Sequence, residues 1–179
     1  MYRLFVAIDL PGSVRAQLAD LGRELDGVRL VPPDQLHLTL RFIGNADDEC
    51  FQRIKDSLAT VTSPPFTLAL AGVGCFPSPR RPRVIWAGIT PNERLTLLQR
   101  AVEKAVAAAG IPPEERPFCP HITLARLKEA IPEGFPAFQS RHGGLSAEPF
   151  TVEEFLLYSS TLTAGSALHR REASYRLTG

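Results

Sequence analysis

The sequence offers little that would support a disulfide framework or a membrane span. Its three cysteines, Cys50, Cys75 and Cys119, lie far apart, and none belongs to a Cys-x-x-Cys pair. An odd number of widely spaced cysteines is typical of buried thiols in a reducing interior, and no signal-like apolar segment stands at the start. No apolar run approaches the length of a transmembrane helix. We therefore expect a cytoplasmic protein that does not associate with membranes.

A large net charge is also missing. Twenty Lys and Arg residues face 19 Asp and Glu residues, so the net charge is +1. This balance does not indicate a nucleic-acid partner, and any basic contact surface must be local. One local cluster, Arg80, Arg81 and Arg83, fits a solvated hairpin loop and an RNA contact equally well. The 179 residues suit one domain or two tightly fused halves with a substantial core.

The first half of the chain alternates short apolar runs with amphipathic segments. The apolar runs predict strands, and the helices are expected to begin after Ser13, as an N-cap, and near Asp47. Gly72 and Gly74 predict a bulge or a close backbone approach. In order, the expected elements are a strand at 3–10, a helix at 14–25, an edge strand at 28–31, a strand at 36–42 closed by Gly44-Asn45, a helix at 47–60 and a strand at 66–76.

The second half repeats this order. Residues 83–91 align with residues 3–11 at an offset of 80, and a predicted helix at 92–109 follows. Further on the offset is 84, which aligns His121 with His37 and Phe150 with Phe66. A weak helix at 133–141 is the counterpart of the one at 47–60. Repetition of whole supersecondary units indicates a duplicated chain.

The expected fold is therefore α+β, with residues 1–179 forming a single bilobal domain. The pseudo-repeats cover approximately 1–79 and 80–165, and a C-terminal strand at 166–179 completes the fold. Two mainly antiparallel sheets would line a central cleft, and the helices would cover their outer faces.

Each half carries one His-x-Thr strand. Because side chains alternate along a strand, His37 and Thr39 share one face, as do His121 and Thr123, while the leucines and isoleucine between them face the other way. Two imidazoles can act as acid and base in one displacement near neutral pH, and hydroxyls can bind phosphate oxygens. One such pair is usually an ordinary polar strand face. Two pairs at equivalent positions favour a symmetric site for an anionic group.

The motifs His37-Leu-Thr-Leu40 and His121-Ile-Thr-Leu124, with residues 116–120 and the hairpin 76–88, resemble the 2H phosphoesterase superfamily. More narrowly they resemble its RNA 2′,3′-cyclic phosphodiesterase branch, historically called 2′-5′ RNA ligases, over nearly the whole chain. The resemblance implies a LigT-like bilobal fold and metal-independent hydrolysis of RNA 2′,3′-cyclic phosphate ends to 2′-phosphates, without a cofactor. It also implies that His37 is the proton donor, His121 the proton acceptor, and Thr39 and Thr123 the phosphate ligands.

Other side chains are candidates for substrate contacts. Arg41 lies two residues beyond Thr39, so alternation places it on the His37 face. Arg126 resembles the Arg that ends the second motif in the family, but alternation turns it away from the site unless the strand bends or ends there, and a structural ion pair is an equal alternative. Phe42 and Phe118 fit base stacking or the core. We expect His142 and His169 at the surface.

The stretch 166–171 departs from the resemblance, because an aromatic residue normally follows the glycine that corresponds to Gly165. Arg170 and Arg171 could add positive charge there.

Three alternatives stay open. One is a zinc site made from His37, His121 and Cys119, although the spacing matches no zinc motif. The second is an RNA-binding module without catalysis. The third is a related activity, either 2′-5′ RNA ligation or hydrolysis of another cyclic nucleotide. The expected partner is RNA with a cyclic phosphate end, such as a tRNA fragment, or a small cyclic nucleotide, bound by a monomer.

Overall fold

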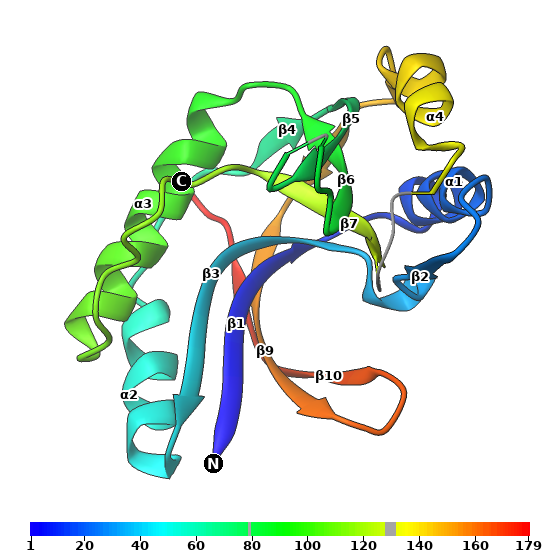
Figure 1. Cartoon of the computed structure of the whole chain (residues 1–179). Helices are drawn as coiled ribbons and strands as arrows, with labels where there is room; N and C mark the ends of the chain where they lie inside the picture. The colour runs from blue at the N-terminus through cyan, green and yellow to red at the C-terminus, as the bar shows by residue number, and fades with distance from the viewer. Residues whose placement is uncertain (79, 128–131) are drawn as a thin grey trace.

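The computed structural model describes residues 1–78, 80–127 and 132–179. Its main sheet, drawn in Figure 1, consists of two strand groups. Among the described residues, the two groups meet at one register pair. We call β10-β9-β1-β3 the first lobe and β5-β6-β7, with β2 also paired to β7, the second lobe. All of these pairings are antiparallel. Strand bounds are β1 Tyr2–Asp9, β2 Val28–Leu30, β3 His37–Ala46, β4 Phe66–Leu68, β5 Leu70–Phe76, β6 Val84–Ile89, β7 His121–Leu127, β8 Phe150–Val152, β9 Glu154–Leu162 and β10 Ala167–Arg176.

A pseudo-twofold axis relates the lobes. Leu38 of β3 pairs with Ile122 of β7, and the separate two-stranded sheet pairs Thr67 of β4 with Thr151 of β8. Both pairs are 84 residues apart, which is the offset between the two His-x-Thr motifs. Residues that face their own repeat equivalents lie on a twofold axis, so the structure confirms the duplication inferred from the sequence.

The two halves of the chain exchange elements. Strand β5 comes from the first half but pairs with β6, while β9 and β10 come from the second half and extend the sheet beside β1. The helices are exchanged in part, since α1 (Gly12–Gly22) contacts β7 and α3 (Glu93–Ala108) contacts β3. Each lobe therefore contains residues from both halves.

The helices cover one face of each lobe (Figure 1). Helices α2 (Asp48–Leu58) and α3 pack together beside β3, whereas α4 (Phe135–His142) contacts β5; a short 3₁₀ turn (Pro33–Gln35) precedes β3. Leu4, Val6 and Ile8 of β1 lie in the hydrophobic core on this helix side. We call the opposite side of the sheet the inner face. No helix in the described part of the chain is long and apolar enough to cross a membrane.

Two of the predicted helix starts are confirmed, and one is wrong. Asp47 and Asn92 cap α2 and α3, accepting hydrogen bonds from the backbone N–H of Cys50 at 2.8 Å and Leu95 at 3.0 Å. Helix α1 begins at Gly12, with Pro11 at the N-cap and no side-chain cap, so Ser13 is inside the helix. Proline fits this position because the first helical N–H groups have no intrahelical acceptor.

The strand boundaries differ from the prediction in two places. Gly44-Asn45 does not close the first His strand, because Gly44 adopts a φ of 89° and β3 continues to Ala46. The predicted strand at 66–76 is divided into β4 and β5, which belong to different sheets. The first strands of the two repeats, β1 and β6, are offset by 79 residues and not by the 80 that their sequence similarity indicates. Asp9 of β1 pairs with His37, and Gly88 of β6 takes the equivalent position opposite His121.

Candidate active site

The contact between β3 and β7 brings the two His-x-Thr motifs together. Because Leu38 pairs with Ile122 in antiparallel register, His37 lies across from Thr123 and Thr39 across from His121. The side chains of Leu38 and Ile122 are fully buried, whereas the two histidines and two threonines are partly exposed on the inner face. The duplicated motifs therefore form one pseudosymmetric group of two imidazoles and two hydroxyls.

Each His strand contains a β-bulge directly after its threonine. In β3, Thr39 and Arg41 pair with the consecutive residues Ala7 and Val6 of β1, which leaves Leu40 as the extra residue. In β7, Thr123 and Ala125 pair with Trp86 and Ile85 of β6, which leaves Leu124. An extra residue reverses the alternation of side chains beyond it.

The bulge in β3 overturns the predicted position of Arg41. Its side chain is only 7% exposed, and its Nε donates to Glu103 Oε2 of α3 at 2.6 Å. Its remaining nitrogens donate to the carbonyl oxygens of Phe42 and Pro112. Arg41 thus faces the helix side and ties β3 to α3, so the expectation that it shares the His37 face is wrong.

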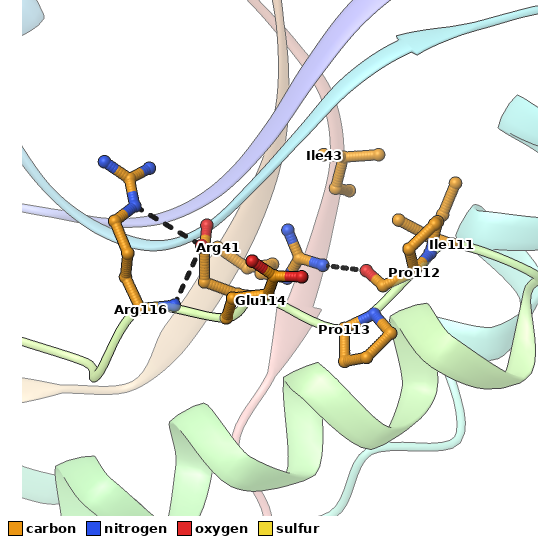
Figure 2. A pocket seen from close by; sticks show the side chains of 8 residues that line it. Arg41, Ile43, Ile111, Pro112, Pro113, Glu114 and Arg116 are labelled. Carbon is orange, nitrogen blue, oxygen red and sulfur yellow. Dashed lines mark hydrogen bonds and ion pairs between the residues drawn. The ribbon is translucent and has the colours of Figure 1, made fainter.

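A depression of about 450 Å³ lies beside Arg41, between β3 and the segment after α3 (Figure 2). It is open to solvent and lined mainly by residues 111–116. In the close-up, Arg41 points toward Pro112, and Arg116 is bonded to Glu114 (Figure 2). The depression is therefore separate from the histidines, which lie on the other face of β3.

The same bulges bring Phe42 and Arg126 to the inner face. The ring of Phe42 is half exposed and lies 5.7 Å from that of Phe5, which stacks on His37. Arg126 is exposed, and its positive charge contributes to lowering the pKa of His121, after the larger effect of burial. Simple alternation turns Arg126 away from the site, and the bulge reverses that expectation.

His37 has a defined tautomer. Its Nδ1 lies 2.6 Å from the carbonyl oxygen of Gln35, which can only accept, so Nδ1 carries the proton. Its Nε2 lies 3.0 Å from Thr39 Oγ1, and the threonine hydroxyl donates to it when the ring is neutral. Burial lowers the pKa of His37 to about 4, with a small further contribution from the charge of His169. The ring is therefore neutral near pH 7 in the free protein.

His121 has a similar but more open environment. Its Nδ1 lies 2.7 Å from the carbonyl oxygen of Cys119, which leaves Nε2 directed away from the backbone. Burial lowers its pKa as well. The Cys119 thiol is exposed, and it is the residue's backbone oxygen that holds His121. Within the described residues, no group of three His, Cys, Asp or Glu side chains is placed to hold a metal ion.

Aromatic rings support both histidines. Phe76 packs edge-on against His121 with the ring centroids 4.9 Å apart, and Trp86 lies 5.2 Å from Phe76. A Cβ atom at Gly74 would lie 2.4 Å from the Trp86 ring, so only glycine lets this ring lie over β5. The close approach predicted at this glycine is thereby confirmed.

His169 was expected at the surface, but it belongs to this group. Its ring lies 5.5 Å from that of His37 and 4.9 Å from that of Phe5. Pairing of β10 with β9 places it there, and the side chain of Gln35 also donates to the carbonyl oxygen of Ala167, two residues earlier, at 2.5 Å. This contact could not be predicted from the sequence, because His37 and His169 are far apart in the chain and His169 belongs to no motif. Tyr158 of β9 also stacks on Phe5, with the ring centroids 5.3 Å apart.

The other candidates lie outside the group. Arg80, Arg81 and Arg83 are exposed around the β5–β6 turn. His142 lies at the surface of α4, with Nε2 2.8 Å from Glu24 Oε2. Phe118 is partly buried against the hydrophobic core.

Comparison with protein families agrees with this arrangement. A family model described as "LigT like Phosphoesterase" matches the chain twice in succession, at residues 8–86 and 88–168, so that each match contains one His-x-Thr motif. The chain belongs to this family. The 2H resemblance of the two motifs and the expected duplicated α+β fold are thereby confirmed.

Relatives from several organisms match most of the chain. A protein of Archaeoglobus fulgidus named RNA 2′,3′-cyclic phosphodiesterase is 34% identical over 94% of this chain and 96% of its own length. A Thermus thermophilus protein of the same name is 35% identical over 99% of this chain and 91% of its own length. The crystal structure of E. coli LigT complexed with 3′-AMP superposes with a TM-score of 0.81 at 32% identity, covering 99% of both chains.

Proposed function

We propose that the protein hydrolyses RNA 2′,3′-cyclic phosphate ends to 2′-phosphates, using His37 and His121 as a metal-independent acid–base pair. The observation that carries the proposal is the Leu38–Ile122 pair, which sets the two His-x-Thr motifs opposite one another on one face. The names of the relatives supply the substrate class, since they are called RNA 2′,3′-cyclic phosphodiesterases.

In the proposed reaction a water molecule attacks phosphorus in line with the bond to the 3′ oxygen. Nε2 of His121 takes the proton of the water as its oxygen bonds to phosphorus. The P–O3′ bond breaks, and the 3′ oxygen takes a proton from Nε2 of His37. The products are a 2′-phosphate and a 3′-hydroxyl, and proton exchange with solvent restores the pair.

Substrate binding prepares His37 for the donor role. The ring is neutral in the free protein, but the negative charge of a cyclic phosphate beside it favours the imidazolium. Once Nε2 is protonated it no longer accepts from Thr39, whose hydroxyl is then free to donate to a phosphate oxygen. Thr123, across from His37, has the equivalent role in the second lobe, and Arg126 contributes positive charge on the same face.

Product analysis tests the activity. Phosphorus NMR of a 2′,3′-cyclic nucleotide or a cyclic-ended oligoribonucleotide, incubated with the protein in excess EDTA, should show a 2′-phosphomonoester. A 3′-phosphate product would overturn the predicted bond cleavage. Loss of turnover in EDTA that returns with a divalent ion would overturn the metal-independent mechanism.

A change of leaving group tests which histidine is the acid. In the 4-nitrophenyl ester of a 3′-deoxynucleoside 2′-phosphate, the leaving nitrophenolate needs no proton. His37→Ala should therefore lose much less rate on this ester than on the cyclic nucleotide, whereas His121→Ala should lose the rate on both. If instead His121→Ala kept its rate on the ester and His37→Ala lost it, His121 would be the acid and His37 the base.

A second candidate is ligation, in which a 5′-hydroxyl attacks phosphorus in place of water, the P–O3′ bond breaks and a 2′-5′ linkage forms; it would use the same four side chains. The product assay separates it, because ligation joins a cyclic end to a 5′-hydroxyl end and lengthens the RNA.

A further inference from the structure

Arg171 occupies the inner face of the first lobe. It pairs with Tyr158 of β9, and Tyr158 pairs with Phe5 of β1, so the three side chains share the face that carries His37. Its neighbour Arg170 alternates to the opposite face and is 83% exposed, near Glu172. The two arginines in the divergent C-terminal stretch therefore have different surroundings.

Arg171 belongs to a charged cluster centred on Asp9. Its Nη2 donates to Asp9 Oδ2 at 2.6 Å, and the hydroxyl of Tyr158 donates to Asp9 Oδ1, also at 2.6 Å. A second guanidinium, that of Arg15, lies 3.6 Å from Asp9 Oδ1. Two arginines against one carboxylate leave an excess of one positive charge. The side chain of Arg171 is 52% exposed, and its bond to Asp9 uses one of the five N–H donors of the guanidinium.

The cluster is adjacent to the candidate active site. Asp9 is the direct register partner of His37, which places their Cα atoms about 5 Å apart. The guanidinium of Arg171 is hydrogen-bonded to Asp9, so it lies roughly 10 Å from His37, although the backbone of β10 is three strands away from β3. Between them, the partly exposed rings of Tyr158 and His169 offer surfaces for a base.

We propose that Arg171, held by Asp9 and Tyr158, binds the phosphodiester that precedes the cyclic phosphate of an RNA end. The planar guanidinium suits a phosphate, and the distance corresponds to a neighbouring nucleotide rather than to the reacting phosphate. This inference rests on the proposed function and narrows its substrate: the protein prefers cyclic-ended oligoribonucleotides to nucleoside 2′,3′-cyclic monophosphates, which lack that phosphodiester.

The test compares kcat/KM on a cyclic-ended trinucleotide and on the matching cyclic mononucleotide. Arg171→Gln should lower the trinucleotide-to-mononucleotide ratio about tenfold, the effect expected for one lost phosphate contact. Arg171→Lys should recover part of the ratio, because the charge returns without the planar fork. Arg170→Gln, next to it but on the other face, is the matched control and should keep the wild-type ratio. A thermal unfolding scan of each variant shows whether the fold is retained.

A binding measurement keeps the inference separate from the proposed activity. Fluorescence anisotropy of a 5′-labelled trinucleotide with a 2′-phosphate end should weaken with salt less steeply in Arg171→Gln than in the wild type, by about 0.7 in the log–log slope. If the protein shows no turnover but Arg171→Gln still changes this slope, the proposed hydrolysis is wrong and the proposed phosphate contact of Arg171 is supported. An unchanged slope, or a folded Arg171→Gln variant with the wild-type ratio, would overturn the subsite and leave Arg171 as an ion pair only.

Discussion

At the scale of single residues, the protonation of His37 and His121 determines what the site can do. Backbone carbonyl oxygens hold both Nδ1 protons, so both Nε2 atoms face the site as acceptors in the neutral state. Burial lowers both pKa values, and that of His37 falls to about 4. Acid–base catalysis needs one protonated and one neutral imidazole, so kcat/KM follows the fraction of free protein in which the pair carries one proton. Because His37 has the more strongly lowered pKa, that proton lies mainly on His121 and has to pass to His37 when the cyclic phosphate binds.

The pH dependence of kcat/KM follows from these pKa values, because it reports the free protein. Below about pH 4 both rings are protonated and the base is lost, whereas above the lowered pKa of His121 both are neutral and the acid is lost. We expect a bell-shaped profile with a maximum between pH 4 and 6.5. A steady-state profile on a cyclic mononucleotide measures it. A maximum above pH 7 would contradict the lowered pKa values.

At the scale of secondary structure, the paired bulges at Leu40 and Leu124 determine which side chains join the histidines. Each bulge follows its threonine by one residue, and beyond it the strand presents Phe42 or Arg126 instead of Arg41 or Ala125. Ala125 is fully buried and Arg41 nearly so. The identical position of the bulge in both repeats makes it part of the site's architecture.

Arg41 and Arg126 provide a matched test of this arrangement. Arg41→Met should lower the free energy of unfolding by about 3 kcal/mol, because a buried ion pair with Glu103 is broken. Its kcat/KM, measured well below the unfolding transition, should stay within a factor of about two, the ordinary outcome for a residue outside the site.

Arg126→Met should behave in the opposite way, with an unchanged unfolding midpoint and a KM raised about tenfold, as for one lost charged contact. Chemical denaturation measures the stability of both variants, and steady-state kinetics measures their kcat/KM and KM. A large decrease in the kcat/KM of folded Arg41→Met would show instead that Arg41 contributes to substrate binding or turnover.

Period-two alternation suffices to predict the shared faces of His37 and Thr39 and of His121 and Thr123, because no irregularity lies between them. It fails at Arg41 and Arg126, since nothing in Leu40 or Leu124 marks an extra residue. The caps at Asp47 and Asn92 are predictable from local hydrogen-bonding chemistry. Tyr158, His169 and Arg171 join the site through long-range strand pairing, which short-range patterns do not encode.

At the scale of the whole molecule, the exchange of elements makes the lobes interdependent. The first lobe needs β9 and β10 from the second half of the chain, and the second lobe needs β5 from the first. The one register pair between the described residues of the His strands lies on the pseudo-twofold axis, so the site forms only when both lobes are complete. The repeat boundary near residue 80 and the monomeric state stay predictions.

Dividing the chain between residues 79 and 80 tests this interdependence. Neither 1–79 nor 80–179 contains a complete lobe, so each fragment alone should lack a cooperative unfolding transition. Mixing or co-expressing the two should restore both the transition, followed by circular dichroism, and turnover of the cyclic substrate. Cooperative unfolding of the isolated 1–79 fragment would show instead that the sequence repeats are independent folding units.

The central claim is that His37 and His121 act as one catalytic pair across the twofold axis. Its most direct test is kcat/KM on a 2′,3′-cyclic nucleotide for the wild type, His37→Ala, His121→Ala and the double variant, each shown to be folded. Each single variant should lose about 10²- to 10⁴-fold, and the double variant should lose little more than either single one, because paired groups act as a unit. Near-wild-type turnover by folded His37→Ala or His121→Ala would contradict the account.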